Sequence, residues 1–234
     1  MSRTQSGAAG SEARSRGGRA LDSTRDSVLR QAALELLAEV GYDRLTMDAV
    51  AARAHAGKPT IYRRWHGKAE LVVDALNSLK GAPTVPDTGS LRGDLDALAA
   101  SLSDAEGQFG VRLMVGMLNA LTRDAELRQL FLEKFLAPRL DAFRIVFSRA
   151  VARGEMSGGH DLDLLARLLP AFALQELILT GEMPTPGFAH YVTNQLLHPL
   201  ATAPATNGTS GLVPIAVPTG TDDRRYAPAQ EEIL

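Results

Sequence analysis

The chain of 234 residues contains no cysteine, which excludes a disulfide framework and any metal site built from thiolates. It also lacks an apolar run long enough to cross a membrane, because the best candidate, residues 164–179, is interrupted by Arg167, Pro170, Gln175 and Glu176. The N-terminus has no apolar core of the kind found in signal peptides. These absences together predict a protein of the reducing cytoplasm.

Motifs of the common enzyme classes are missing as well. The sequence has no nucleophile elbow, no glycine-rich phosphate loop and no HExxH, and its five histidines are scattered. The segment His160-Asp161-Leu162-Asp163 could be taken for a metal site, but Asp161 stands where the following helix needs an N-cap. We therefore predict that the protein is not an enzyme and has no cofactor and no metal. A helical enzyme that assembles its site from distant residues is the alternative.

Strand-like alternation is absent and Leu and Ala dominate, so the sequence predicts an all-α fold. We expect four regions: a disordered arm at 1–21, a first helical unit at 22–80, a second at 81–201 and a disordered tail at 202–234. In the first unit, a wide apolar stripe marks a helix that Gly41 ends. In the second unit, helices are expected near 91–105, 109–122, 125–153, 161–181 and 187–200.

The most informative segment is residues 46–68, TMDAVAARAHAGKPTIYRRWHGK. Thr46 is a good N-cap for a short helix, whose apolar positions end at Ala54. Residues 55–57 break that pattern, and a second helix over 58–65 then places Ile61 and Trp65 on one face. Two short helices joined by such a turn form a helix-turn-helix, whose second helix enters the major groove of DNA.

The outer face of this second helix is basic and polar. Arg63 points most directly away from the face of Ile61 and Trp65, and Arg is the commonest bidentate reader of guanine. Thr46, Tyr62 and Lys68 lie at helix starts or on the flank, where such groups hold phosphates. The predicted DNA-contacting residues are Thr46, Lys58, Pro59, Thr60, Tyr62, Arg63, Arg64 and Lys68. An ordinary solvated helix in a bundle is the alternative.

Residues 24–80 resemble the DNA-binding domain of the TetR family of bacterial transcriptional regulators. The similarity runs through TRDSVLRQAALELLAEVGYDRLTMDAVAARA and KPTIYRRWHGKAELVVDAL. His55 stands where the family usually has a turn glycine, so it would have to adopt a left-handed conformation. Gly57 replaces the usual capping serine and can still serve as an N-cap. The resemblance implies an N-terminal three-helix helix-turn-helix DNA-binding domain followed by a helical ligand-binding and dimerisation domain.

The distribution of charge agrees with DNA binding, although the net charge of −2 does not point to it. Residues 1–70 hold 12 Lys and Arg against 8 Asp and Glu, and the remainder holds 13 against 19. The positive excess therefore lies where DNA phosphates would be bound, although chance could produce an excess of this size. The arginines of the arm, Arg3, Arg14, Arg16 and Arg19, either contact DNA or form a solvated tail.

The helix expected at 161–181 is apolar around much of its circumference, more than one core face requires. A second copy of the chain would cover the remainder, and the resemblance implies that the last two helices pair in a four-helix bundle. The predicted dimer interface comprises Leu165, Leu169, Leu174, Leu177, Tyr191 and Gln195. Burial of these residues within one monomer is the alternative.

Soft, bulky side chains lie on the middle helices, where the resemblance implies a small-molecule pocket. Few polar residues interleave with them, so we expect an apolar effector; a plain core is the alternative. The predicted pocket residues are Met114, Met117, Leu118, Leu121, Phe135, Phe143 and Phe147. Taken together, the sequence predicts a homodimeric transcriptional regulator, a repressor that a small molecule releases from a palindromic double-stranded DNA operator. The alternative is a helical protein–protein adaptor without sequence-specific DNA binding.

Overall fold

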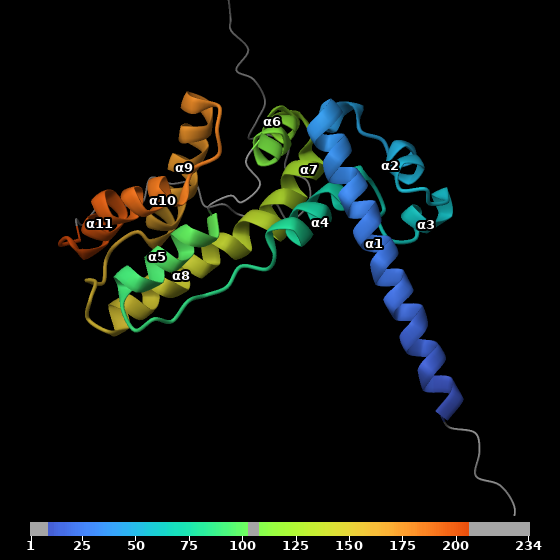
Figure 1. The fold of residues 1–234 in the computed structure, drawn as a ribbon. Helices are drawn as coiled ribbons and strands as arrows, with labels where there is room; N and C mark the ends of the chain where they lie inside the picture. The colour runs from blue at the N-terminus through green and yellow to red at the C-terminus, as the bar shows by residue number, and fades with distance from the viewer. Residues whose placement is uncertain (1–8, 103–107, 206–234) are drawn as a thin grey trace, which may run out of the picture.

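The structure is a computed structural model, which describes residues 9–102 and 108–205, with side chains for 24–101 and 109–205. Over these residues the chain is helical and has no strand. Figure 1 shows helices α1 to α4 at one end of the molecule and α5 with α9 to α11 at the other, joined by α6, α7 and the long α8. The predicted all-α fold, with an N-terminal helix-turn-helix unit before a helical domain, is confirmed.

The N-terminal unit consists of α1 (Ala9–Arg44), α2 (Met47–Arg53), α3 (Lys58–Tyr62) and α4 (Lys68–Lys80). The regular part of α1 ends at Gly41, whose φ of 75° is open to glycine and costly for other residues, as the sequence predicts. At its other end α1 begins at Ala9, within the range 1–21 for which we expect a disordered arm, and the division of the chain into these regions stays a prediction. Residues 1–8 lie outside the described part.

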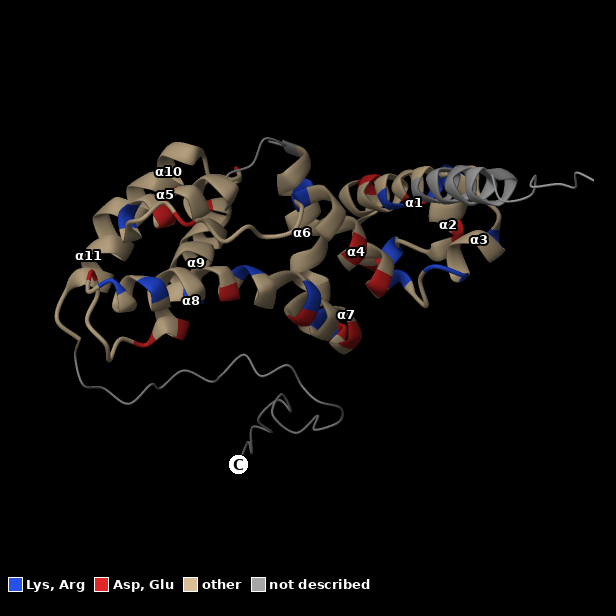
Figure 2. Ribbon diagram, turned by 90° about the horizontal axis from the view of Figure 1, so that it is seen from below, with Lys and Arg blue, Asp and Glu red and all other residues tan. Residues whose placement is uncertain are grey.

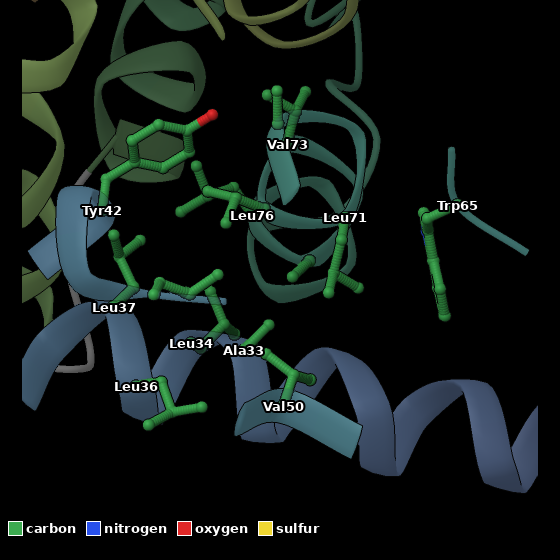
Figure 3. Packing of buried hydrophobic residues seen from close by; sticks show 14 of the residues in the cluster. Ala33, Leu34, Leu36, Leu37, Tyr42, Val50, Trp65, Leu71, Val73 and Leu76 are labelled. Carbon is green, nitrogen blue, oxygen red and sulfur yellow. The ribbon is translucent and has the colours of Figure 1, made fainter. Parts of the chain in front are cut away.

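Side chains from α1, α2 and α4 point toward one another and form the core of this unit (Figure 3). Leu37 of α1, Val50 of α2 and Leu71 of α4 are each fully buried. Ile61 and Trp65, the two residues predicted to anchor the second helix of the motif, belong to the same core. Hydrophobic burial therefore fixes the orientation of α3 relative to α1 and α4.

The middle helices α6 (Gln108–Arg123), α7 (Ala125–Leu130) and the π-helical turn η1 (Phe131–Leu136) share that core. α6 approaches α1 very closely at Gly116, where an added Cβ would lie 2.7 Å from the backbone oxygen of Leu37. Asp124 caps α7 by accepting from Leu127 N, and it also accepts a hydrogen bond from Tyr42 Oη at 3.0 Å. The N-terminal unit is thus packed directly against the region in which an effector pocket was predicted.

A second core lies between α5 (Leu91–Leu102), α8 (Ala137–Ala152), α9 (Leu162–Thr180) and the last helix. The last helix runs from Pro186 to Thr202 as α10 (Pro186–Val192), η2 (Thr193–Leu197) and α11 (His198–Thr202). These bounds confirm the helices predicted at 125–153, 161–181 and 187–200 to within a few residues. Asp161 caps α9, as predicted, by accepting from Leu164 N at 3.0 Å. Residues 206–234 of the predicted tail lie outside the described part.

A buried carboxylate joins α5 to the end of α8. Asp94 is fully buried, accepts hydrogen bonds from Thr88 and forms an ion pair with Arg153 at 3.2 Å. Burial acts to raise the pKa of Asp94, but the hydrogen bonds from Thr88 and Arg153 outweigh it and hold this pKa below its usual range. In the described part of the chain, no helix is long and apolar enough to cross a membrane.

Candidate nucleic-acid interface

The first helix of the motif begins at a side-chain cap. Thr46 has extended backbone angles, and its Oγ1 accepts a hydrogen bond from Ala49 N at 3.2 Å, as the sequence predicts. This bond satisfies one of the N–H groups that a helix start leaves without a partner. The Thr46 residue is itself exposed, so the cap lies at the surface.

The turn between α2 and α3 has the conformation expected from its two departures from the family pattern. His55 adopts a φ of 50°, the left-handed conformation that the sequence predicts. Gly57 is the N-cap of α3 with extended angles and no side-chain hydrogen bond, and Pro59 lies in the first turn of that helix. Both predictions are confirmed, and the turn geometry of a helix-turn-helix is preserved.

The second helix is shorter than predicted. Regular helix ends at Tyr62, and Arg63 is its C-cap, whereas the sequence pattern led us to expect helix through Trp65. Trp65 is held in the core instead, where its Nε1 donates to Asp74 Oδ2 of α4 at 2.9 Å. Arg30 of α1 binds the same oxygen at 2.8 Å, so a single carboxylate ties α1, α4 and the end of the motif together. This contact with α4 explains why α3 is shorter than the helix that the spacing of Ile61 and Trp65 predicts.

The basic side chains of the motif differ in their partners. Lys58 Nζ lies 2.6 Å from Asp48 Oδ2, and Arg64 Nε lies 3.2 Å from Asp26 Oδ1. The hydrogen bond from Lys58 to Asp48, and the charge of that carboxylate, raise the pKa of Lys58 and keep it charged. Arg63 is exposed, and among the described residues none forms a hydrogen bond or ion pair with its side chain. Its guanidinium is therefore available to a ligand in solution.

Lys68, the first residue of α4, is held against α1. Its Nζ donates to the backbone oxygen of Tyr42 at 3.2 Å and lies 4.2 Å from the centre of the Tyr42 ring. An ammonium over the face of an aromatic ring is stabilised by the quadrupole of the ring. The start of α4 is thereby positioned next to the end of α1, with the charge of Lys68 half-exposed.

All eight predicted DNA-contacting residues lie at the N-terminal end of α2, along α3 and its C-terminal flank, or at the start of α4. Figure 2 shows the basic residues of this end of the molecule gathered around α3 and the segment that leads to α4. The side chain of Lys58 is 67 % exposed, and Tyr62 is 53 % exposed. The sequence reasoning missed Asp48, an exposed acid that pairs with Lys58 across the turn. No spacing rule connects two residues on different helices, so only the fold reveals this pair.

The residues predicted to line an effector pocket belong to two different cores. Met117, Leu121 and Phe135 pack with the N-terminal unit, whereas Phe143 and Phe147 are buried in the second core. Met114 and Leu118 are half-buried. The structure therefore does not bring the seven together around one space. Two hollows, with volumes of about 290 and 490 Å³, are lined by residues of α1 and the α2–α3 region instead. A pocket among the middle helices stays a prediction.

The predicted dimer residues divide in a similar way. Leu165, Leu169 and Leu177 are buried within the monomer, which favours the alternative that these three residues belong to its core. Leu174, Tyr191 and Gln195 are exposed, as an interface requires. The sequence reasoning missed Ile178 and Leu179, which are 69 % and 70 % exposed. Ile178 lies four residues after Leu174, so a helical projection of α9 could have found it.

Comparison with known proteins agrees with this arrangement. Residues 29–75 match the bacterial regulatory proteins of the tetR family, and residues 85–196 match the tetracyclin repressor-like C-terminal domain. An uncharacterized HTH-type transcriptional regulator of Mycobacterium tuberculosis is 35 % identical over 181 residues, 77 % of this chain and 89 % of the relative. A DNA-binding transcriptional repressor TetR of Mycobacteroides abscessus is 36 % identical over 176 residues, 74 % of this chain and 93 % of the relative.

Solved structures show the same fold. A putative transcriptional regulator of Pseudomonas aeruginosa superposes with a TM-score of 0.60 at 18 % identity, over 76 % of this chain and 91 % of that one. The regulator FadR of Bacillus subtilis, solved in complex with stearoyl-CoA, superposes with a TM-score of 0.53 at 18 % identity. That superposition covers 75 % of this chain and 97 % of FadR.

Proposed function

Since the chain belongs to the TetR family of DNA-binding transcriptional regulators, we propose that it is a homodimeric repressor that a small molecule releases from a palindromic operator. The observation that carries the proposal is the helix-turn-helix itself, with a capped α2, a left-handed turn residue and an α3 anchored through Trp65. The relative from Mycobacteroides abscessus, named a repressor, supports the sign of regulation.

Recognition of DNA is assigned to α3 and its flanks. Arg63 is exposed and has no acidic partner in the described part of the chain, so its guanidinium can donate to the O6 and N7 atoms of guanine. Thr46, Tyr62 and Lys68 lie at the edges of this surface, where hydroxyl and ammonium groups bind phosphates and set the register. Pro59, Thr60 and Arg64 complete the surface in contact with the groove.

Dimerisation is assigned to the outer faces of α9 and the last helix. Leu174 and Ile178 lie on one face of α9, and Tyr191 of α10 is 66 % exposed. Apolar side chains of this size, gathered on two adjacent helices, are typical of an interface and unusual on a monomer. A two-fold axis through this face would place two copies of α3 on one side of DNA, with half-sites about one helical turn or more apart.

Release by an effector is supported by the packing of the middle helices. α6 shares a core with α1 and lies against it at Gly116, so a molecule that displaces α6 also displaces the DNA-binding unit. The structural relative FadR was solved with stearoyl-CoA, which agrees with the apolar effector expected from the Met and Phe residues of this region. The effector would bind the released conformation more tightly than the operator-bound one.

Selection of DNA from a random pool by the purified dimer tests this function. The expected result is an enriched site with two inverted half-sites, since a two-fold symmetric protein imposes its symmetry on the operator. The Arg63→Ala variant should enrich a site with relaxed preference at one position in each half-site. An unaltered site with this variant would remove Arg63 from base reading. If the wild-type protein enriches no sequence, the adaptor function is favoured and the proposal fails.

A further inference from the structure

An acidic residue lies on the surface that faces DNA, paired with a basic one. Asp48 is the second residue of α2 and Lys58 the first of α3, and their side chains meet across the turn at 2.6 Å. Both are open to solvent, with 53 % of the Asp48 side chain and 67 % of the Lys58 side chain exposed. The N-terminal residues of the second helix are those that contact base edges in a helix-turn-helix. Lys58 occupies that position, and the ion pair holds Asp48 beside it.

A carboxylate is unfavourable close to the phosphates of DNA, because like charges repel. An acid in the first turn of a helix does favour the helix dipole, but Glu or Asp at any exposed position of that turn would serve equally. The helix dipole explains an acid in the first turn of α2, but it does not explain why this acid forms an ion pair with Lys58. Asp48 therefore fits this surface best if its acceptor oxygens, and not only its charge, are used in the complex.

The hydrogen-bonding groups of the pair match those of one base pair. A lysine ammonium has three donors, so after binding Asp48 it retains two, which suit the O6 and N7 acceptors of guanine. The Oδ1 atom of Asp48 is not engaged by Lys58, and a carboxylate oxygen accepts from the N4 amino group of cytosine. In a G·C pair, O6 and N4 are joined by a hydrogen bond of about 2.9 Å, close to the 2.6 Å that separates Lys58 Nζ from Asp48 Oδ2.

We propose that Asp48 and Lys58 together read a single G·C base pair in each half-site, with Lys58 on guanine and Asp48 on cytosine. This inference rests on the proposed function and adds a specificity determinant to it. The preference for G·C over A·T follows from the order of the hydrogen-bonding groups that each base pair presents in the major groove. A G·C pair presents acceptor, acceptor and donor, so the ion pair satisfies all three. An A·T pair presents acceptor, donor and acceptor, which leaves its thymine O4 opposite the carboxylate without a donor.

DNA selection with matched variants tests the assignment. The full-length wild-type protein should enrich half-sites that contain one invariant G·C pair. Asp48→Ala and Lys58→Ala should each lose the preference for that pair by about tenfold or more, and both at the same position. Glu39→Ala is the control, because Glu39 is equally exposed and also forms an ion pair of 2.6 Å, with Arg53, but on α1. Its enriched site should match that of the wild type.

Two further measurements separate base reading from a loss of folding or of charge. Asp48→Asn keeps the size of the side chain and one acceptor oxygen but removes the charge, so it should unfold like the wild type and retain part of the preference for the G·C pair that Asp48→Ala loses. Replacing the guanine by 7-deazaguanine, which lacks the N7 acceptor, should weaken binding by the wild type and leave binding by Lys58→Ala unchanged. Uniformly tighter binding by Asp48→Ala with an unaltered site would overturn the inference, as would losses at different base pairs in the two variants. Failure of the wild type to enrich any site would instead overturn the proposed function.

Discussion

Leu177 and Ile178 are neighbours on α9 that should respond to the same substitution in opposite ways. Leu177 is 5 % exposed, whereas Ile178 is 69 % exposed and lies on the face assigned to dimerisation. Replacing each by Glu places an identical charge either inside the monomer or on its surface. Leu177→Glu should prevent folding, and Ile178→Glu should give a folded monomer.

The magnitudes follow from burial. Leu177→Glu gives up about 1.5–3 kcal/mol of apolar burial and adds a buried carboxylate that costs several kcal/mol more. Their sum is comparable with the entire free energy of unfolding of a typical domain, about 5–15 kcal/mol. An exposed substitution such as Ile178→Glu changes the stability of a monomer by about 0.5 kcal/mol or less. In a symmetric dimer, the same substitution removes apolar contact from both copies and brings two carboxylates to the seam. Dimerisation should then weaken by about 4 kcal/mol, close to a thousandfold in Kd.

Sedimentation velocity at micromolar concentration and urea unfolding measure the two effects separately. Wild-type protein should sediment as a dimer, and Ile178→Glu as a monomer with a helical circular-dichroism spectrum and weakened binding to the full operator. Leu177→Glu should show no cooperative unfolding. A dimer formed by Ile178→Glu, with operator affinity unchanged, would refute the assignment of this face, and a stable, folded Leu177→Glu would refute the reasoning from burial.

Three other changes follow from contacts in the structure. Lys68→Ala should lower the affinity equally for operator and unrelated DNA, since a phosphate contact carries no sequence information. It should also reduce the slope of log K against log salt concentration by about one. A sequence-selective loss in binding titrations would contradict this role. Gly116→Ala places a methyl group 2.7 Å from the Leu37 oxygen, so urea unfolding should show a free energy of unfolding lower by about 1–3 kcal/mol. An unchanged midpoint would show that α6 shifts freely along α1. Asp94 has a lowered pKa, so its charge contributes stability above the pKa of the unfolded chain, about 3.9, and this contribution is lost as the pH falls through the folded value. The free energy of unfolding of Asp94→Asn, measured by urea unfolding at several pH values, should therefore fall less steeply at acid pH than that of the wild type. An unchanged slope would exclude Asp94 as a source of the acid-dependent loss of stability.

The helix-turn-helix was predicted closely because its signals are local. A cap at Thr46, a turn at His55 to Gly57 and the apolar residue Ile61 act within a few residues, and each was found in its predicted place. The end of α3 could not be predicted in this way. The bond from Trp65 Nε1 to Asp74 lies between residues of two separate elements, and it favours a bend where the apolar spacing alone favours helix.

Helix α9 shows more clearly what helical periodicity in the sequence cannot predict. The large aliphatic residues of α9 appear equivalent in the sequence, yet Leu169 is buried against other helices of the monomer and Ile178 remains exposed. Helical spacing shows which residues share a face, but not which neighbour covers that face. The Phe and Met residues of the middle helices pose the same problem, since Phe147 and Met117 belong to different cores.

The sequence by itself determined the helical class, the order of the helices and the position of the DNA-reading motif, because propensity, capping and apolar periodicity act over one or two turns of chain. Only the tertiary structure decided which apolar faces are buried within the monomer and which charges meet. Asp48 and Lys58 lie ten residues apart on different helices, and their pairing depends on the angle that the turn and the Trp65 anchor impose on α2 and α3. That angle results from burial against α1 and α4, which involves residues far apart in the chain.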